Sequence, residues 1–448
     1  MSIGENKYPI LFFILAFVIY GINTCIQFSS DVKPAALLPF LILKHHTLYF
    51  DAVIPHISDP QYGWGSLFNL VYVNGHYLSA YPIVTPVLLI PVYIIHMLLI
   101  MVFPGGWEYY SVLSKSCASL LVATAVMLFY MVCNRMFEKR TAIITTIVFA
   151  FGTLTWAVSS QTLWQHDSSE LLLVIAILCI VKNEQEENIR NFVILGVAGG
   201  LLLFNRPPDF IMFIPVLYYV WLHRENIYAF LFWFSVSAVP FLIYNITMFG
   251  SIFGGYDNIA VAYSTSTFPV VNSVISLMTL LISPNRGLFV YSPVLLFAIW
   301  GVWKCKNKVL LWFVPVCFLT AYFYSVHLDN LAGGWCYGPR YLCALLPVLC
   351  LFVGYAIEKM DRKWWAVFTV LLVFSICVQA IGAWGYPFSE WNQRSDLTDR
   401  SRVWDTQDIQ IVDSFWAIQK TETVSVFIWP TLPPPIGYWV LWEKGDYL

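Results

Sequence analysis

Long apolar runs constrain this chain more than any other feature of its sequence. They recur along most of the 448 residues, and several reach about 20 residues, enough to cross roughly 30 Å of hydrocarbon as a helix. Only 11% of the residues are charged, whereas a soluble domain has about 25%. A backbone in lipid must satisfy its own hydrogen bonds, so these runs have to be helical. The sequence therefore predicts an all-α integral membrane protein.

The breaks between the apolar runs alternate between basic and non-basic. Basic residues in short loops favour the cytoplasmic side, which predicts a cytoplasmic N-terminus and outward-facing intervening breaks. The basic breaks contain Lys7; Arg135, Lys139 and Arg140; Lys182 and Arg190; Arg224; Lys304, Lys306 and Lys308; and Lys359, Arg362 and Lys363.

This alternation requires that the apolar run at 82–103 does not cross the membrane. Its prolines Pro82, Pro86 and Pro91 each remove a helix hydrogen bond, which suits a segment that lies along the bilayer or dips into it. The run at 273–282 is too short to span. About eleven spanning helices remain, predicted at 9–28, 110–134, 141–160, 168–181, 191–205, 208–222, 226–247, 287–303, 309–326, 341–357 and 364–384.

The first outward-facing loop has structure of its own. Two short strands are predicted at 69–81 around an Asn74-Gly75 turn, a strong hairpin signal. Residues 34–43 predict an interfacial helix that lies flat on the membrane.

The chain accordingly divides into a membrane domain at 1–386, with a structured outer loop at 29–108, and a small extracytoplasmic tail at 387–448. The run at 9–28 is too long for the core of a signal peptide and lacks a cleavage site, so we interpret it as a retained helix. The ten cysteines lack CxxC or Cys/His spacing and support neither a disulfide framework nor a zinc site. A net charge of −2 gives no indication of a nucleic-acid partner.

Polar residues at the outward ends of the predicted spans are the candidates for function. Charge near hydrocarbon is costly and is functional by default, and the planar fork of arginine binds phosphate oxygens bidentately. We therefore expect one outward polar cavity with carboxylates and several arginines. Its candidate residues are Asp31, Lys33, His76, Trp164, Gln165, His166, Asp167, Arg206, Asp209, Arg286, Asp329 and Arg340.

Four groups of segments resemble lipid-carrier-dependent glycosyltransferases of the GT-C superfamily, which are related to protein O-mannosyltransferases and aminoarabinose transferases. The segment at 29–38 contains an aspartate followed by a loop helix, and Gly-His-Tyr-Leu-Ser-Ala-Tyr-Pro at 75–82 is similar to the family's Ser-x-Tyr-Pro-Pro-Gly stretch. The third group pairs 283–293 with 333–341. The fourth, Val-Trp-Asp-Thr-Gln-Asp-Ile-Gln at 403–410, is similar to a Leu-Trp-Asp-Trp-x-Asp-x-Gln-Ile stretch of many members. Their order along the chain is that of the family.

The resemblance implies a GT-C-type catalytic domain that transfers a hexosyl or pentosyl group from a polyprenyl-phosphate donor to a glycan, lipid or protein acceptor on the outer side. Membrane lipids are its other partners. The role of general base carries over to Asp31, because a carboxylate can accept the proton of the attacking hydroxyl. Many members have a second acid at the next position, whereas Val32 stands here. We therefore expect a metal-independent reaction without a cofactor.

Fixed cations stabilise the charge that develops on a departing phosphate. For donor binding we predict Arg340, Arg286 and Arg206, with Lys33 and Tyr337. Further substrate contacts are predicted at His76, Tyr81, Gln165, His166 and Trp335.

Several of these residues have a structural alternative. Asp31 is also suited to cap the helix that begins near Pro34. Asp167 and Glu170 have the spacing of a capping box for a helix from Ser168, which we favour over a catalytic role. Similarly, Arg206 can satisfy free carbonyls at a helix end, and Arg340 can extend to lipid headgroups.

Two alternative functions remain. A transporter or flippase for a lipid-linked saccharide should place polar residues at mid-membrane on broken helices, whereas the polar residues here gather at one face. A non-catalytic partner in glycan assembly is the other, and it would tolerate an Asp31→Asn substitution.

Overall fold

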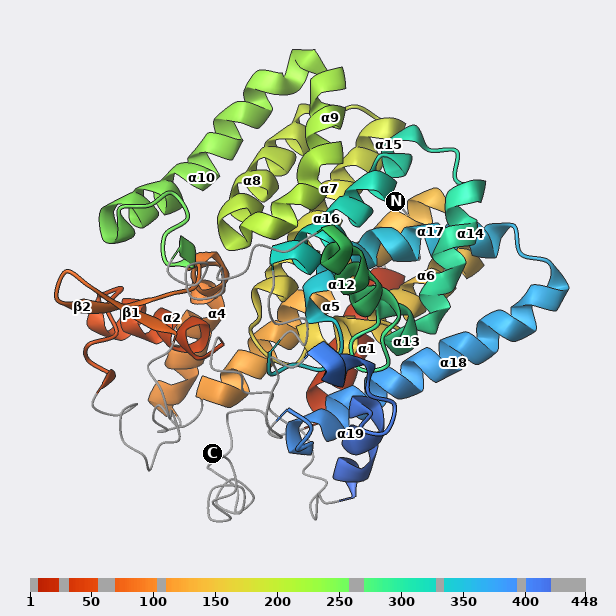
Figure 1. Ribbon diagram of the computed structural model, residues 1–448. Helices are drawn as coiled ribbons and strands as arrows, with labels where there is room; N and C mark the ends of the chain where they lie inside the picture. Colours follow the sequence, from red (N-terminus) through yellow and green to blue (C-terminus); the bar gives the residue numbers. More distant parts are fainter. Residues whose placement is uncertain are drawn as a thin grey trace.

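Helices form almost all of the secondary structure (Figure 1). The computed structural model describes residues 7–23, 32–54, 69–102, 110–257, 270–327, 334–392 and 400–419. The α-helices are α1 (Lys7–Ile22), α2 (Lys33–His45), α4 (Val84–Val102), α5 (Tyr110–Met136), α6 (Lys139–Phe151), α7 (Gln165–Gln185), α8 (Ile189–Asn205), α9 (Ile214–Leu222), α10 (Ile227–Phe249), α12 (Val270–Ile282), α13 (Leu288–Tyr291), α14 (Leu296–Lys304), α15 (Lys308–Leu311), α16 (Phe313–His327), α17 (Leu346–Glu358), α18 (Arg362–Gly385) and α19 (Gln410–Ile418). Short 3-10 segments are η4 (Pro207–Phe213), η5 (Arg224–Asn226), η6 (Pro293–Leu295), η7 (Arg340–Leu345), η8 (Tyr386–Phe388) and η9 (Arg400–Trp404), and η3 (Thr155–Ser159) is a π-helix.

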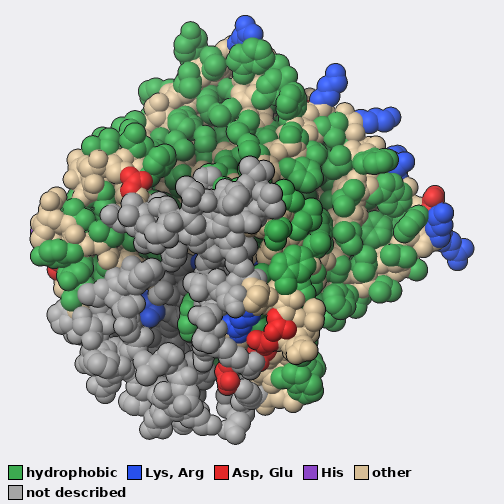
Figure 2. All heavy atoms as spheres, in the orientation of Figure 1, with side chains coloured by type: hydrophobic (Ala, Val, Ile, Leu, Met, Phe, Trp, Pro, Cys, Tyr) green, Lys and Arg blue, Asp and Glu red, His purple; other side chains and the backbone are tan. Residues whose placement is uncertain are grey.

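The predicted all-α membrane fold is confirmed. Within the described residues, five helical stretches are long and apolar enough to cross a membrane: 113–136, 224–249, 308–326, 340–358 and 362–388. Large apolar side chains of α1, α10 and α18 are exposed, as lipid-facing helices require. On the face drawn in Figure 2, hydrophobic side chains cover most of the described bundle, and Lys and Arg project at its upper and right margins.

Some predicted spans are interrupted. The stretch predicted at 141–160 is α6 followed by the separate π-helical turn η3. The stretches predicted at 208–222 and 341–357 begin as the 3-10 segments η4 and η7, and each changes to an α-helix just before a proline, Pro215 or Pro347. Proline is compatible with the first turn of an α-helix but not with its interior.

Contacts between helix ends define two ends of the bundle. At one end, which we call the basic end, Nζ of Lys139 lies 4.2 Å from the ring centre of Tyr8, and the amide of Glu138 donates to Glu358 at 3.0 Å. At the opposite end, which we call the polar end, Nζ of Lys115 donates to Oδ1 of Asn23 at 2.9 Å. The end of α1 therefore meets the start of α5 at the polar end. This arrangement agrees with the prediction that the intervening run, which forms α4, makes no net crossing.

The described part of the loop between α1 and α5 forms a small unit beside the bundle. Strands β1 (Leu70–Val73) and β2 (His76–Ser79) pair antiparallel. The predicted turn is confirmed, with φ of 52° at Asn74 and 88° at Gly75. Helix α2 matches the helix expected at 34–43 and packs against α4, where the Tyr93 hydroxyl donates to the carbonyl of Ala36 at 2.9 Å. In Figure 1 this unit lies at the lower left, at the polar end of the bundle.

Small residues allow close helix contacts elsewhere. Helix α8 crosses α10 at Gly196 and Gly200, where an added Cβ would lie 2.4 Å from the carbonyl oxygen of Phe230 and 2.2 Å from Oγ of Ser237, respectively. The backbone of α10 is thereby held against α8, which ends at the functional site described next.

Candidate functional site

An ion-paired arginine lies at the polar end, directly after α8. Nε of Arg206 donates to the Tyr324 hydroxyl at 2.9 Å and lies 3.3 Å from Oδ2 of Asp209. The Tyr324 hydroxyl in turn donates to Oδ1 of Asp209 at 2.6 Å. Asp209 is fully buried, and the Arg206 side chain is 11% exposed. This closed arrangement fixes the orientation of the guanidinium. Within the described residues, the guanidinium of Arg206 binds side chains and not the helix-end carbonyls of the structural alternative.

A second arginine approaches the same group of aromatic rings. The guanidinium carbon of Arg340 lies 4.1 Å from the ring centre of Trp164 and 5.2 Å from that of Tyr341. The guanidinium carbon of Arg206 lies 5.6 Å from the Tyr341 ring centre. Arg340 is only 8% exposed, which is unlike a side chain that extends to lipid headgroups. Two predicted donor-binding arginines, far apart in sequence, thus meet at one tyrosine ring.

The start of α7 supplies polar groups to this site. Oε1 of Gln165 accepts from Nη1 of Arg206 at 3.5 Å and also from the Tyr256 hydroxyl. The ring of Tyr81, from the loop between α1 and α5, packs edge-on against Tyr256 with 6.2 Å between the ring centres. His166 lies 6.3 Å from the Tyr341 ring. The site thus gathers Gln165, His166 and Tyr81 around the arginines, and their contacts with substrate stay a prediction.

Two buried carboxyl groups follow on the first turns of α7. The predicted capping box is wrong, because the helix begins at Gln165 and its N-cap, Trp164, makes no side-chain cap bond. Glu170 instead accepts hydrogen bonds from Thr155, at 3.1 Å, and Ser159. Asp167 is fully buried, and within the described residues its carboxylate has no hydrogen bond from another side chain; the donors beside it are the backbone amides of Asp167 and Ser168. A buried carboxyl group without a side-chain partner is costly, so Asp167 stays among the candidate residues.

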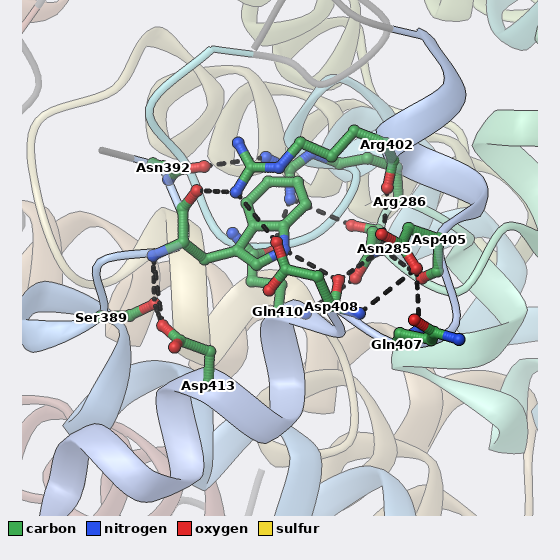
Figure 3. Close-up of polar contacts among 11 residues, drawn as sticks. Asn285, Arg286, Ser389, Asn392, Arg402, Asp405, Gln407, Asp408, Gln410 and Asp413 are labelled. Carbon is green, nitrogen blue, oxygen red and sulfur yellow. Dashed lines mark hydrogen bonds and ion pairs between the residues drawn. The ribbon is translucent and has the colours of Figure 1, made fainter. Parts of the chain in front are cut away.

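Arg286 and Tyr337 bind other parts of the protein. Arg286 is fully buried, donates to Oε1 of Gln410 at 2.5 Å and lies 4.8 Å from the Trp391 ring centre (Figure 3). The Tyr337 hydroxyl donates to the carbonyl of Val378 at 2.8 Å. The sequence alone does not distinguish Arg286 and Tyr337 from the site arginines, because the partners of Arg286 and Tyr337 are distant along the chain.

The remaining predicted residues lie outside this cluster. His76 pairs with Asp51 at 2.8 Å on the exposed hairpin, and Trp335 is 46% exposed. Lys33 is the first residue of α2, where burial lowers the pKa of its amine to about 8. Asp31, the predicted general base, lies outside the described residues.

Within the ranges that the structure describes, no three His, Cys, Asp or Glu side chains are grouped so that they could hold a metal ion. The metal requirement stays a prediction from the sequence.

Residues 111–249 match the family model described as dolichyl-phosphate-mannose-protein mannosyltransferase. The matched region runs from α5 to α10 and includes Gln165, His166 and Arg206. No curated protein sequence matches the chain.

Among solved structures, the fold is similar to that of ArnT from Cupriavidus metallidurans, both bound to undecaprenyl phosphate and in the apo state. In each comparison the TM-score is 0.54 and the identity 9%, over 93% of this chain and 76% of that chain. This chain thus shares its fold with ArnT, and the match to the family model is confined to residues 111–249.

Proposed function

We propose that this protein is a glycosyltransferase that moves a sugar from a polyprenyl-phosphate carrier to an acceptor at the outer face of the membrane. The matching family model is described as a dolichyl-phosphate-mannose-protein mannosyltransferase, and the similar ArnT structure holds undecaprenyl phosphate. Both names support a polyprenyl-phosphate donor here. In this proposal the polar end faces outward and the basic end faces the cytoplasm.

The convergence of Arg206 and Arg340 on Tyr341 is the observation on which this proposal rests. A phosphodiester has one negative charge and becomes a more highly charged monoester when the sugar leaves it. Fixed guanidinium groups in a buried site stabilise that developing charge. Asp209 and Tyr324 orient one of the two groups before the donor binds.

Asp31 is the proposed general base. Its carboxylate takes the proton from the acceptor hydroxyl while the hydroxyl oxygen bonds to the anomeric carbon. The bond from that carbon to the phosphate oxygen breaks, and its electron pair leaves with the polyprenyl phosphate. Because Val32 replaces the second acid of many family members, the proposed step contains no metal.

Other side chains have supporting roles in this proposal. Lys33, outside the arginine cluster, adds positive charge at the start of α2, and aromatic rings such as Tyr81 and Tyr256 offer stacking surfaces for sugar rings. Gln165, which accepts from both Arg206 and Tyr256, links these two groups.

The test is transfer in vitro from synthetic polyprenyl-phosphate sugars to a panel of glycan, lipid and peptide acceptors. We expect turnover by the wild type and a loss of roughly a hundredfold or more in Asp31→Asn, since positioned bases contribute about 10²–10⁴-fold. Arg190→Ala is the matched control for removal of an arginine, because Arg190 is exposed next to the basic end. It should retain wild-type turnover.

Two results would contradict the proposal. Normal turnover in Asp31→Asn would remove that residue from the reaction and favour a different base. Movement of lipid-linked saccharide across vesicle membranes without any transfer would instead support the transporter alternative.

A further inference from the structure

The loop that precedes Arg340 is held mainly by residues distant in the sequence. Residues 334–339 have no regular secondary structure, and Gly334 and Gly338 have φ of 70° and 60°. Such left-handed positions suit glycine and fix a tight path of the backbone. The polar groups of this loop must therefore find partners outside regular structure.

Gln410, the first residue of α19, supplies two of these partners. Its Nε2 donates to the carbonyl of Cys336 at 3.0 Å, and its Oε1 accepts from the amide of Gly338 at 3.0 Å. Nδ2 of Asn392 also donates to the Cys336 carbonyl, at 3.3 Å. The side-chain amide of Gln410 thus binds the loop backbone at two positions, Cys336 and Gly338.

Gln410 is itself held in place from several directions. Its Oε1 also accepts from Nη1 of Arg286 at 2.5 Å and from the Tyr291 hydroxyl at 2.9 Å. Its backbone amide donates to Oδ1 of Asn285 at 2.7 Å. The side chain is fully buried. Its orientation is therefore determined by the bundle and not by solvent.

Asn285 binds the backbone of the tail. Its Nδ2 donates to the carbonyls of Arg402, Asp405 and Asp408 at 3.0, 2.9 and 3.1 Å (Figure 3). Trp391 adds a second fixed point, because the guanidinium carbons of Arg286 and Arg402 lie 4.8 and 4.2 Å from its ring centre. The segment 400–410 is consequently docked by directed bonds.

The same loop contacts Arg340. The amide of Arg340 donates to the carbonyl of Gly338 at 3.1 Å. A Cβ added at Gly334 would lie 3.6 Å from Nη2 of Arg340, while the Gly334 carbonyl accepts from Nη2 of Arg286 at 3.5 Å. The loop therefore lies between the docked tail and the guanidinium that stacks on Trp164.

We propose that Gln410 is a positioning residue: it fixes the loop at 334–339 and, through that loop, the guanidinium of Arg340. Docking of the tail segment 400–410 is then a requirement for the geometry of the site. The activity readout below rests on the proposed function, whereas the thiol readout does not. Failure of the positioning role of Gln410 is thereby distinguishable from failure of the proposed function.

Cys336 reports on the loop directly, because it is a fully buried thiol within it. Its modification by N-ethylmaleimide is followed by peptide mass spectrometry in the full-length protein. We expect a roughly tenfold faster modification in Gln410→Ala, since local opening follows the loss of its hydrogen bonds. Gln410→Glu replaces the donor to Cys336 by a carboxylate oxygen but keeps an acceptor for Arg286, and it should be intermediate. Gln407→Ala is the matched control, because Gln407 is exposed three residues earlier.

Cys343 in η7 provides the internal reference, since it is also fully buried. It should stay protected in every variant. Unchanged protection of Cys336 in Gln410→Ala would contradict the proposal. Equal exposure of Cys343 would also contradict it, because the effect of Gln410 would then be on general folding.

The second readout is a double-mutant cycle on sugar transfer. We expect Gln410→Ala to lower kcat roughly tenfold or more, because small displacements of positioned groups are costly. In an Arg340→Lys background the same substitution should have little further effect, since Gln410 acts through Arg340. Fully additive losses in the two backgrounds would show that Gln410 acts independently of Arg340. Absence of any transfer in the wild type would count against the proposed function and leave the thiol result standing.

Discussion

Two arginine clusters lie on either side of Gly334 and differ in what satisfies their guanidinium groups. In the site cluster, Arg206 pairs with a carboxylate and a tyrosine hydroxyl, and Arg340 stacks on Trp164. In the tail cluster, Arg286 donates to neutral oxygens, among them the side-chain oxygen of Gln410 and the backbone carbonyl of Asn285. Both clusters are buried and both contain a tryptophan.

This difference separates two roles of arginine in one chain. The tail cluster uses its donors to join two segments more than 100 residues apart in sequence, such as Arg286 and Gln410 at a separation of 124. The site cluster gathers cationic groups around aromatic rings instead. We therefore expect substitutions in the tail cluster to affect stability first and those in the site cluster to affect turnover first.

The largest effect is expected for Arg340→Ala. Removal of a preorganised donor to a developing negative charge costs about 10²–10³-fold in rate, so kcat/KM for sugar transfer should fall by that factor. The thermal midpoint of the purified protein should change little. Retained turnover together with lost stability would place Arg340 in the same class as Arg286.

The converse pattern is expected for Arg286→Ala. Buried acceptors left without donors cost roughly 1–3 kcal/mol each, so a fall of about 3 kcal/mol in stability is expected. Thermal unfolding and limited proteolysis of the tail measure it. Arg224→Ala, at the basic end, is the control for loss of an arginine without loss of this network. A stable Arg286→Ala protein with abolished turnover would instead assign Arg286 to the site.

A smaller effect is expected for Tyr324→Phe. This change removes the hydroxyl that accepts from Arg206 and donates to Asp209 but keeps the ring that stacks on Tyr341 at 5.4 Å. Loss of a hydrogen bond to a charged group costs about 1.5–3 kcal/mol. We expect transfer to fall roughly tenfold or somewhat more. Tyr322→Phe, on the more exposed face of the same helix, should leave it unchanged; equal losses in both would argue against an orienting role.

The smallest effect concerns Lys33 and pH. Burial lowers the pKa of its amine to about 8, so the positive charge is present below that pH and is lost as the pH rises through it. If Lys33 supports donor binding, KM for the donor should rise a few-fold between about pH 7 and pH 9. Because a lowered pKa favours the neutral amine in the folded state, this loss does not come from unfolding. Lys33→Arg should give a flatter profile, and an identical profile would exclude Lys33 as its cause.

Local signals in the sequence predicted local structure well. The Asn74-Gly75 turn and the helix at 34–43 formed as expected, because each depends on residues close together in the chain. The alternation of basic breaks predicted the pairing of helix ends, since charge at membrane boundaries acts on each loop separately.

Long-range contacts explain what the sequence did not predict. Spacing alone suggested a cap at Asp167 and Glu170, but packing of α7 against its neighbours buries both carboxyl groups. Similarly, Arg286 and Arg340 both stand in short segments with glycine, proline and aromatic residues. Only the contact of Arg286 with the docked tail distinguishes the two arginines. The resemblance at 403–410 indicated that this segment matters, yet the pairing of Gln410 with Cys336 and Gly338 is visible only in three dimensions.

A cryo-electron microscopy structure of the protein with undecaprenyl phosphate tests the central claim most directly. We predict that the phosphate lies beside Tyr341, within hydrogen-bonding distance of the guanidinium groups of both Arg206 and Arg340. A phosphate bound at the basic end, or one held by neither of these arginines, would contradict the proposed site.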